Sequence, residues 1–199
     1  MAREHHEAAE TARCLDEALA GTFPASDPPA MTSPVAATPS ADLVVEAAHG
    51  PVRVHRVIDA AQASEPFAPT SNGGRWSPPG QACVYASASP AGALLEYLAH
   101  HAGEPASGLM LATAELPAGT TLAECNEPST WRERPYRAEV QQAGADWLGS
   151  GRSLALRVPS ALVDGEVNVL LDPSHPGYAA LQVQSLAPLQ LDARLRSAK

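Results

Sequence analysis

Alternating hydrophobic and polar positions predict a set of strands that begins near Leu43. The segments LVVE and VRVHRVID carry β-branched residues in alternation, among them Val52, Val54 and Val57, and this pattern is typical of half-buried strands. Further strands are predicted over residues 82–86, 109–117, 153–162, 167–173 and 181–191.

Two segments between these strands have a helical pattern instead. Ser89 is a good N-cap, Pro90 suits the first helical position and Gly103 follows the end of the first helix. The second helical region lies within residues 131–148 and ends near Gly149. Because these helices interrupt the strands without a regular β-α-β alternation, we expect an α+β domain with a mixed or antiparallel sheet and flanking helices.

Residues 1–42 are predicted to form a leader outside this domain. Residues 7–19 have the spacing of a short helix that stops at Gly21, and residues 23–41 are dominated by Pro, Ala, Ser and Thr. Such a composition cannot bury enough apolar surface to offset its conformational entropy, so we expect a flexible linker. The folded domain would then cover residues 43–199. The leader is either a docking element or an unstructured extension.

Charge and hydropathy argue against several classes of protein. The 199-residue chain has 13 Lys+Arg and 22 Asp+Glu, a formal net charge of -9, which is the wrong sign for a protein that holds a nucleic-acid backbone by counterion release. No run approaches the roughly 18 to 20 apolar residues needed to cross a bilayer. The N-terminus lacks the basic start and apolar centre of a signal peptide. We therefore expect a cytoplasmic protein that binds neither nucleic acid nor membrane directly.

The cysteines and paired histidines do not predict a metal site. Cys14, Cys83 and Cys125 are far apart and lack Cys-x-x-Cys spacing, so we interpret them as ordinary thiols. His100 and His101 are adjacent, and adjacent residues point to different sides of a helix. We expect no bound metal.

The segment Gly73-Gly74-Arg75-Trp76 is a candidate ligand-binding turn. Two glycines let the backbone approach a ligand closely, and an arginine beside them suits bidentate binding of a phosphate or pyrophosphate. The pattern alone is equally compatible with a turn shaped by the glycines and a tryptophan packed in the core. Neither GxGxxG nor a P-loop is present.

Glu96 is the second candidate, because it lies in the most apolar part of the first predicted helix. We expect Leu94, Leu95 and Leu98 to form the buried stripe, with Glu96 beside it. The carboxylate faces either solvent or a cleft. In a cleft it could stabilise an oxocarbenium-like transition state and accept a hydrogen bond from a ribose hydroxyl.

Three other residues, Ser160, Tyr85 and His175, have two readings each. Ser160 ends a strand, where its hydroxyl binds a ligand or caps the turn. Tyr85 belongs to the core or lines a cleft, where it could stack on a planar group. Asn168 and His175 lie in NVLLDPSHP, and His175 is either an acid or base or a turn residue that satisfies backbone groups.

The order of these blocks resembles the RES domain, whose name comes from an Arg, a Glu and a Ser. The matching stretches are GGRWSPPGQACVYASASPAGALLEYLAH, then LALRVPSALV, then NVLLDPSHPGY, within residues 52–191. By resemblance, Arg75, Glu96 and Ser160 are the three name residues and Tyr85 is the associated aromatic. A serine follows Trp76 where asparagine is common, and LLDP replaces the more usual LLNP. Neither departure touches the name residues.

The resemblance implies a fold similar to that of ADP-ribosyltransferases and the catalytic roles of the site residues. Glu96 would stabilise the developing charge near C1′ and the 2′-hydroxyl of the nicotinamide ribose. Arg75 would hold the pyrophosphate, Tyr85 would pack on the nicotinamide or ribose, and Ser160 would bind the ribose or phosphate region. Gly74 would let the backbone come close to the substrate.

The resemblance also implies a function. RES proteins are toxins of bacterial toxin–antitoxin pairs, and members deplete NAD⁺ by cleaving its nicotinamide–ribose bond with water or phosphate. We therefore expect an NAD⁺ glycohydrolase or phosphorylase that arrests growth. NAD⁺ would be consumed, so no resident cofactor is expected. The implied partner is a helix-turn-helix antitoxin that covers the active site, and a homodimer stays open. The alternatives are an ADP-ribosyltransferase acting on a specific protein and a catalytically silent RES-like binding module.

Overall fold

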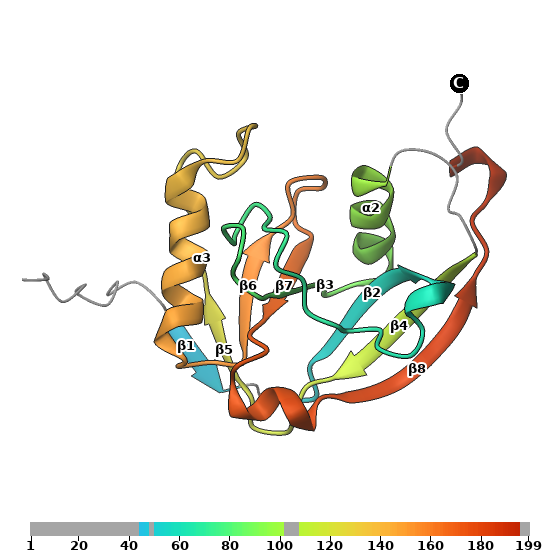
Figure 1. Cartoon of the computed structure of the whole chain (residues 1–199), viewed down its shortest axis with the longest axis horizontal. Coiled ribbons are helices and arrows are strands. Elements are labelled where there is room, and N and C mark those ends of the chain that lie inside the picture. The colour runs from blue at the N-terminus through green and yellow to red at the C-terminus, as the bar shows by residue number, and fades with distance from the viewer. Residues whose placement is uncertain (1–43, 48–49, 102–107, 196–199) are drawn as a thin grey trace, which may run out of the picture. The chain divides into compact units, whose positions relative to one another are not determined.

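A single mixed sheet forms the frame of the molecule (Figure 1). The computed structural model describes residues 44–47, 50–101 and 108–195, so the predicted leader 1–42 lies outside the described residues. The strands are β1 (Val44–Ala47), β2 (Arg53–Asp59), β3 (Val84–Ser87), β4 (Leu109–Glu115), β5 (Thr121–Glu124), β6 (Ala155–Pro159), β7 (Val167–Leu171) and β8 (Gln182–Leu189). The helices are α2 (Pro90–His100) and α3 (Ala138–Ser150), with three 3₁₀ turns, η1 (Ala60–Gln62), η2 (Pro176–Ala180) and η3 (Ala193–Leu195).

The strand order confirms the predicted α+β class. Within the described residues the sheet has eight strands in the order β1-β5-β6-β7-β3-β2-β4-β8. β5 and β6 run parallel, whereas the other neighbouring strands are antiparallel. The prediction of a mixed or antiparallel sheet with flanking helices is therefore correct.

The sheet is nearly divided into two halves at its centre. β2 and β3 are paired only at His55 and Ser87, whereas β2 is paired with β4 along its whole length, from Arg53↔Glu115 to Asp59↔Leu109. Beyond this one pair, the backbone groups of the two strands no longer face each other in register. The two halves therefore diverge there and leave room between β2 and β3 for side chains from elsewhere.

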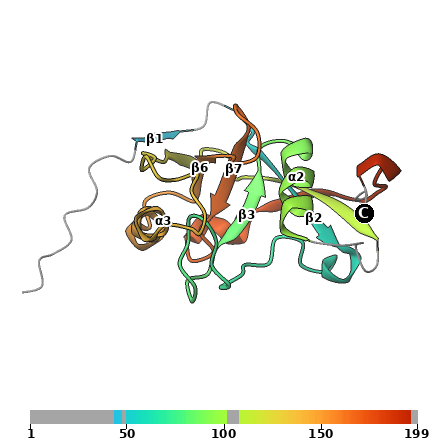
Figure 2. The ribbon, with the colours of Figure 1, turned by 90° about the horizontal axis from the view of Figure 1, so that it is seen from above.

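Each half of the sheet has its own helix, as the two perpendicular views show (Figures 1 and 2). α3 packs through Val140 and Trp147 on a cluster that includes Leu156, Leu170 and Trp76. α2 packs beside β2 through a smaller cluster of Val57, Ala93, Tyr97 and Leu109. The helices therefore flank the place where the two halves separate.

The structure differs from the sequence-based picture at one strand and at one residue of the first helix. β5 was not predicted, because TLAE has four residues and its pairing partners, β1 and β6, are distant in sequence. α3, by contrast, agrees with its prediction, because it begins inside the predicted region 131–148 and ends at Ser150, beside Gly149. Leu95 is 38% exposed and does not join the buried stripe of α2, which consists of Gly92, Ala93 and Tyr97.

In the described part of the chain, no helix is both long and apolar enough to cross a membrane.

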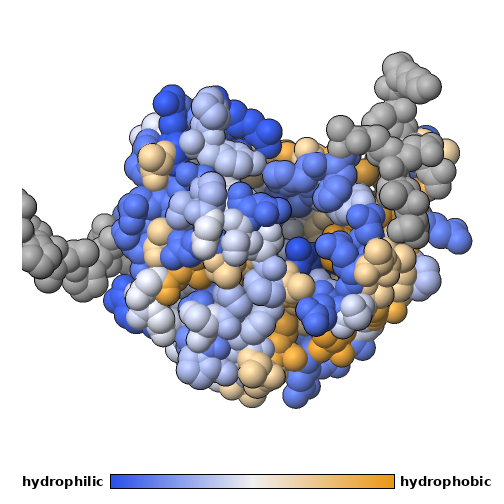
Figure 3. All heavy atoms as spheres, viewed as in Figure 1, coloured by the Kyte–Doolittle hydropathy of each residue, from blue (hydrophilic) through white to orange (hydrophobic). Residues whose placement is uncertain are grey.

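Figure 3 shows hydrophilic side chains over most of the α3 side of one face, while hydrophobic side chains gather at the lower right, over the region of β4 and β8. β8 is an edge strand whose side chains are mostly exposed.

Candidate active site

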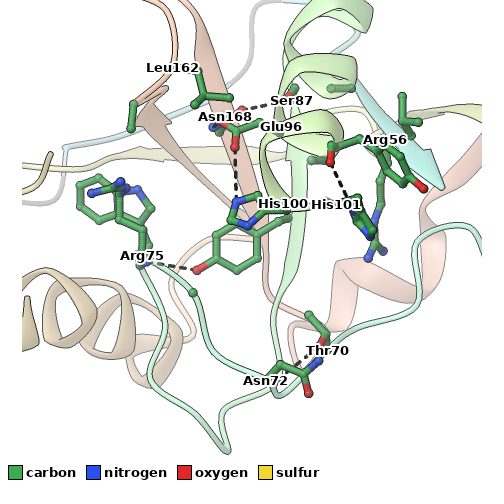
Figure 4. Close-up of a pocket in the computed structure, with 18 of the residues that line it drawn as sticks. Arg56, Thr70, Asn72, Arg75, Ser87, Glu96, His100, His101, Leu162 and Asn168 are labelled. Atoms are coloured by element: carbon green, nitrogen blue, oxygen red, sulfur yellow. Dashed lines mark hydrogen bonds and ion pairs between the residues drawn. The ribbon is translucent and has the colours of Figure 1, made fainter. Parts of the chain in front are cut away.

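A cavity of about 370 Å³ lies where the two halves of the sheet separate, and we call it the cleft. Arg75 and Arg56 line it from opposite sides, with Glu96 and His100 of α2 between them (Figure 4). A volume of this size falls within the range of small-molecule sites. The cleft therefore unites side chains from two half-sheets, one helix and the β2–β3, β5–α3 and β6–β7 connections.

Glu96 is held on one side of its carboxylate only. Oε1 accepts a 2.6 Å hydrogen bond from Asn168 Nδ2 and a 3.3 Å hydrogen bond from Ser160 Oγ. Oε2 has the exposed imidazole of His100 at 3.7 Å, one helical turn further along α2. The carboxylate is thus fixed in direction by Oε1 while Oε2 is turned to the more open side.

Asn168 is oriented in turn by Ser87. Ser87 Oγ donates a 2.7 Å hydrogen bond to Asn168 Oδ1, and the two residues are direct partners between β3 and β7. Ser87 is 1% exposed. Because Oδ1 accepts from Ser87, the amide nitrogen of Asn168 faces Glu96. The hydrogen-bond relay therefore runs from the junction of the two half-sheets to the carboxylate.

The N-terminus of α2 is anchored in a way that places Glu96 over this relay. Ser89 Oγ accepts a 2.9 Å hydrogen bond from Gly92 N and donates a 2.7 Å hydrogen bond to Glu166 Oε2. The predicted cap at Ser89 is confirmed, with Pro90 in the first turn. A Cβ on Gly92 would lie 2.9 Å from Glu166 Oε2, so a glycine there lets the helix approach the β6–β7 connection.

Arg75 faces the cleft and also holds a neighbouring segment. Its Nη1 donates to the carbonyl oxygens of Trp131 and Glu133, the latter at 3.1 Å. Burial lowers the pKa of Arg75 below its ordinary value, and the positive charge of Arg134 acts in the same direction. The guanidinium stays charged at neutral pH, with its other nitrogens available to an anion.

The glycines before Arg75 serve contacts within the protein. Gly73 has φ of +78°, which favours glycine, and a Cβ on Gly74 would lie 2.7 Å from the hydroxyl of Tyr85. That hydroxyl accepts from Trp76 N at 3.1 Å and bonds Ser77 Oγ at 2.9 Å. Gly74 and Tyr85 both line the cleft, and Trp76 is buried in the core. The structural reading of this segment therefore holds, and its ligand-binding reading stays a prediction.

The opposite wall is built around Arg56. Its Nη1 donates to the carbonyl oxygens of Ala68 at 2.9 Å and Pro66 at 3.4 Å, and burial lowers its pKa. Beside it, the rings of Tyr97 and His101 stack with centroids 4.0 Å apart. The Tyr97 hydroxyl donates to Asp59 at 2.8 Å, and burial and this hydrogen bond raise its pKa to about 12.

The family model of the RES domain matches residues 51–193. The chain belongs to the RES domain family. A RES relative named Toxin Res from Yersinia enterocolitica is 36% identical over 62% of this chain and 84% of its own length. Another Toxin Res, from Pseudomonas putida, is 34% identical over 61% of this chain and 85% of its own length. The Prs ADP-ribosylating toxin of Sphingobium is 31% identical over 62% of this chain and 80% of its own length.

The fold is also similar to that of a chain in a solved structure. A chain of the crystal structure of the M.tuberculosis MbcT-MbcA toxin-antitoxin complex superimposes with a TM-score of 0.53 at 15% identity. The match covers 72% of this chain and 87% of that chain. The predicted α+β architecture is therefore confirmed, and the chain is a homologue of the relatives named Toxin Res.

The structure places the predicted RES residues differently with respect to the cleft. Arg75, Tyr85, Gly74 and Glu96 line one cavity. Ser160 is 4% exposed, and its hydroxyl donates to Glu96 Oε1. The expected contact of Ser160 with substrate stays a prediction.

The two remaining candidates have simple outcomes. His175 caps η2, where its Nδ1 accepts from Gly177 N at 3.1 Å, so the turn reading holds, and His175 does not line the cleft. Asn168 contacts Glu96, which sequence reasoning did not anticipate. One signal was present: a polar residue inside the apolar strand VNVLL needs a hydrogen-bond partner.

Sequence reasoning considered His100 only as a metal ligand, and it missed the cleft residues Arg56, Arg134 and Tyr136. They were not singled out because their neighbours in the cleft are distant in sequence. Among the described residues, no group of three or more His, Cys, Asp or Glu side chains is arranged to hold a metal ion.

Proposed function

We propose that this chain is the toxin of a toxin–antitoxin pair and that it cleaves the nicotinamide–ribose bond of NAD⁺. Water or phosphate would accept the ADP-ribose, and loss of NAD⁺ would arrest growth. The observation that carries the proposal is the carboxylate of Glu96, which is fixed through Oε1 and lines the same cleft as Arg75 and Tyr85.

The chemistry of the bond suits a fixed carboxylate. When the bond breaks, nicotinamide leaves as a neutral molecule and positive charge develops on the ribose. A negative group near C1′ stabilises that charge without having to donate a proton. Oε2 of Glu96 would face the ribose and accept from its 2′-hydroxyl, because Oε1 is engaged by Asn168 and Ser160.

Asn168, Ser160 and Ser87 act as positioning residues in this proposal. They contact the carboxylate directly or through one another and are not proposed to touch the reacting atoms. Fixing Glu96 before substrate binds lowers the reorganisation needed in the transition state.

Arg75 and Tyr85 would orient the substrate. The guanidinium of Arg75 would bind the pyrophosphate, and the ring of Tyr85 would pack against the nicotinamide or its ribose. Burial raises the pKa of the Tyr85 hydroxyl, so it stays protonated and bonded to Ser77 at neutral pH. Tyr85 would therefore act as a neutral surface and not as a base.

An antitoxin partner is part of the proposal. The family match and the toxin names of the relatives support it, as does the likeness to a chain from a toxin–antitoxin complex. We propose a helix-turn-helix antitoxin that covers the cleft. A second candidate activity, transfer of ADP-ribose to a specific protein, is favoured by the relative named Prs ADP-ribosylating toxin.

Induced expression in bacteria separates these activities. We expect wild type to arrest growth and to deplete the cellular NAD⁺ pool before growth stops, whereas Glu96→Gln at equal protein level does neither. Arrest with an unchanged NAD⁺ pool and a labelled protein band from labelled NAD⁺ would support the second activity. Equal growth of wild type and Glu96→Gln would contradict both and favour a silent binding module.

A further inference from the structure

We infer that Arg134 and Tyr136 join Arg75 to form a diphosphate-binding site on one wall of the cleft. The inference rests on the proposed function, because the NAD⁺ diphosphate would be the natural occupant. Arg134 and Tyr136 both line the cavity that holds Glu96. They belong to residues 131–137, WRERPYR, which we call the arginine segment.

In the ranges that the structure describes, two of the three arginines in the arginine segment are paired with carboxylates, and the third is not. It has three arginines in a chain whose net charge is -9. Arg132 pairs with Asp164, and Arg137 Nε donates to Glu133 Oε2 at 2.6 Å. Arg134 has no ion pair within the described part of the chain, and it is the arginine of the three that lines the cleft. The cation without a carboxylate partner is thus the one placed to meet a ligand.

Arg75 and Arg134 both contact the ring of Tyr136. Cζ of Arg75 lies 5.0 Å from the ring centroid of Tyr136, and Cζ of Arg134 lies 5.5 Å from the same centroid. Both distances are in the range of cation–π contact. The ring fixes the two guanidiniums near each other, although like charges repel. An anion with two charged groups would offset that repulsion.

Arg75 also holds the arginine segment in place through its backbone. Its Nη1 donates to the carbonyl oxygens of Trp131 and Glu133, on either side of Arg132. These hydrogen bonds hold the arginine segment against the cleft wall. A diphosphate has two phosphate groups, so each can meet one guanidinium, and planar guanidiniums suit phosphate oxygens.

The test measures binding rather than turnover, so that it does not depend on catalysis. ADP-ribose, AMP and inorganic pyrophosphate are titrated calorimetrically into the full chain carrying Glu96→Gln, alone and combined with Arg134→Gln. The matched control is Arg132→Gln, an exposed arginine of the same segment that does not line the cleft. Circular dichroism checks that each variant is folded.

We expect Arg134→Gln to weaken ADP-ribose binding about tenfold, the scale of one charge-assisted hydrogen bond. It should weaken AMP binding less, because AMP has one phosphate, and Arg132→Gln should leave both unchanged. In the enzyme with Glu96 intact, Arg134→Gln should raise KM for NAD⁺ by a similar factor with little change in kcat.

Equal affinity of the Arg134→Gln and Arg132→Gln proteins for ADP-ribose would overturn the inference, and so would the absence of ADP-ribose and pyrophosphate binding to the parent protein. The first result leaves the proposed function intact if wild type still cleaves NAD⁺. Conversely, Arg134-dependent binding of ADP-ribose by a protein that cleaves no NAD⁺ would support the site and contradict the proposed function.

Discussion

The two walls of the cleft both use an arginine to hold backbone carbonyls, but their surroundings differ. Arg56 donates to Pro66 and Ala68, and Tyr178 donates to Phe67 between them. Arg75 donates to Trp131 and Glu133. On the Arg56 wall the neighbouring contacts add further support to the same segment. On the Arg75 wall they add a second guanidinium and an aromatic ring that face the cavity.

This difference shows that a pocket-lining arginine is not by itself a ligand-binding residue. Arg56 is the more deeply buried of the two, and burial is the main cause of its lowered pKa. Its hydrogen bonds stabilise residues 66–68 and shape the wall. Arg75 performs the same task for the arginine segment but stands beside Arg134 and Tyr136. We therefore assign substrate anion binding to the Arg75 wall and support to the Arg56 wall.

Arg75→Ala should have the largest effect on activity. It removes an anion-binding group and also releases the carbonyls of Trp131 and Glu133, so kcat/KM for NAD⁺ should fall by about 10³-fold. Steady-state nicotinamide release measures this. Arg75→Lys should recover little, because one ammonium cannot hold two carbonyls and a phosphate together. If Arg75→Ala kept activity near that of wild type, the assignment of substrate anion binding to the Arg75 wall would be contradicted.

Gly144→Ala should cause the largest loss of stability on the Arg75 wall. A Cβ there would lie 1.7 Å from the carbonyl oxygen of Trp76, so α3 or the Gly74–Ser77 turn must shift. Overpacking of this kind costs about 3 kcal/mol in the free energy of unfolding. Urea unfolding followed by tryptophan fluorescence measures this cost.

Gly149→Ala in the same helix is the matched control. No atom lies within 4 Å of its added Cβ, so this variant should be as stable as wild type or slightly more stable. Equal stability of the two variants would contradict the close packing of Gly144 against the carbonyl oxygen of Trp76.

Arg56→Met should lower the stability of the fold and have little effect on the catalytic rate. It leaves the carbonyls of Pro66 and Ala68 without their donor and should reduce the free energy of unfolding by about 2 kcal/mol. In the folded protein at low temperature, kcat should stay within about threefold of wild type. A kcat loss as large as that of Arg75→Ala, in a protein that is folded, would contradict the assignment of support to this wall.

The smallest effect is expected from His55, which lies at the junction of the half-sheets. Burial, with a further contribution from Arg53, lowers the pKa of His55 below 6.5. The unfolded chain therefore binds a proton below about pH 6.5 that the folded chain does not, and stability falls as the pH drops through this window. In His55→Gln, the loss of stability between pH 7.5 and 5.5 should be smaller than in wild type. An identical pH dependence of stability in wild type and His55→Gln would contradict the lowered pKa of His55.

Much of the frame could be predicted from the sequence because its signals are local. The alternation in VRVHRVID and the Ser89-Pro90 start of α2 depend on neighbouring residues, and the structure has both elements. β5 was missed because four residues gain strand conformation only through pairing with the distant β1 and β6. Long-range pairing leaves no mark in a short window of sequence.

The candidate site divides in the same way. Arg75 and Glu96 stood out because a polar residue follows a glycine turn or interrupts an apolar helix. Asn168 is 72 positions from Glu96 in sequence, and Trp131 is 56 positions from Arg75. Contacts over such separations decide which hydroxyl or amide supports the carboxylate. Ser160, for example, donates to Glu96, which is 64 positions away in sequence.

Release of free nicotinamide from NAD⁺ by the purified, antitoxin-free chain tests the central claim most directly. The reaction is followed with and without inorganic phosphate, for wild type and for Glu96→Gln. We expect wild type to release nicotinamide, with ADP-ribose or its 1″-phosphate ester as the second product according to the acceptor. Glu96→Gln should bind NAD⁺ as well as wild type but turn it over at least about 10²-fold more slowly. No release by folded wild type under either condition, or equal release by both proteins, would contradict the account.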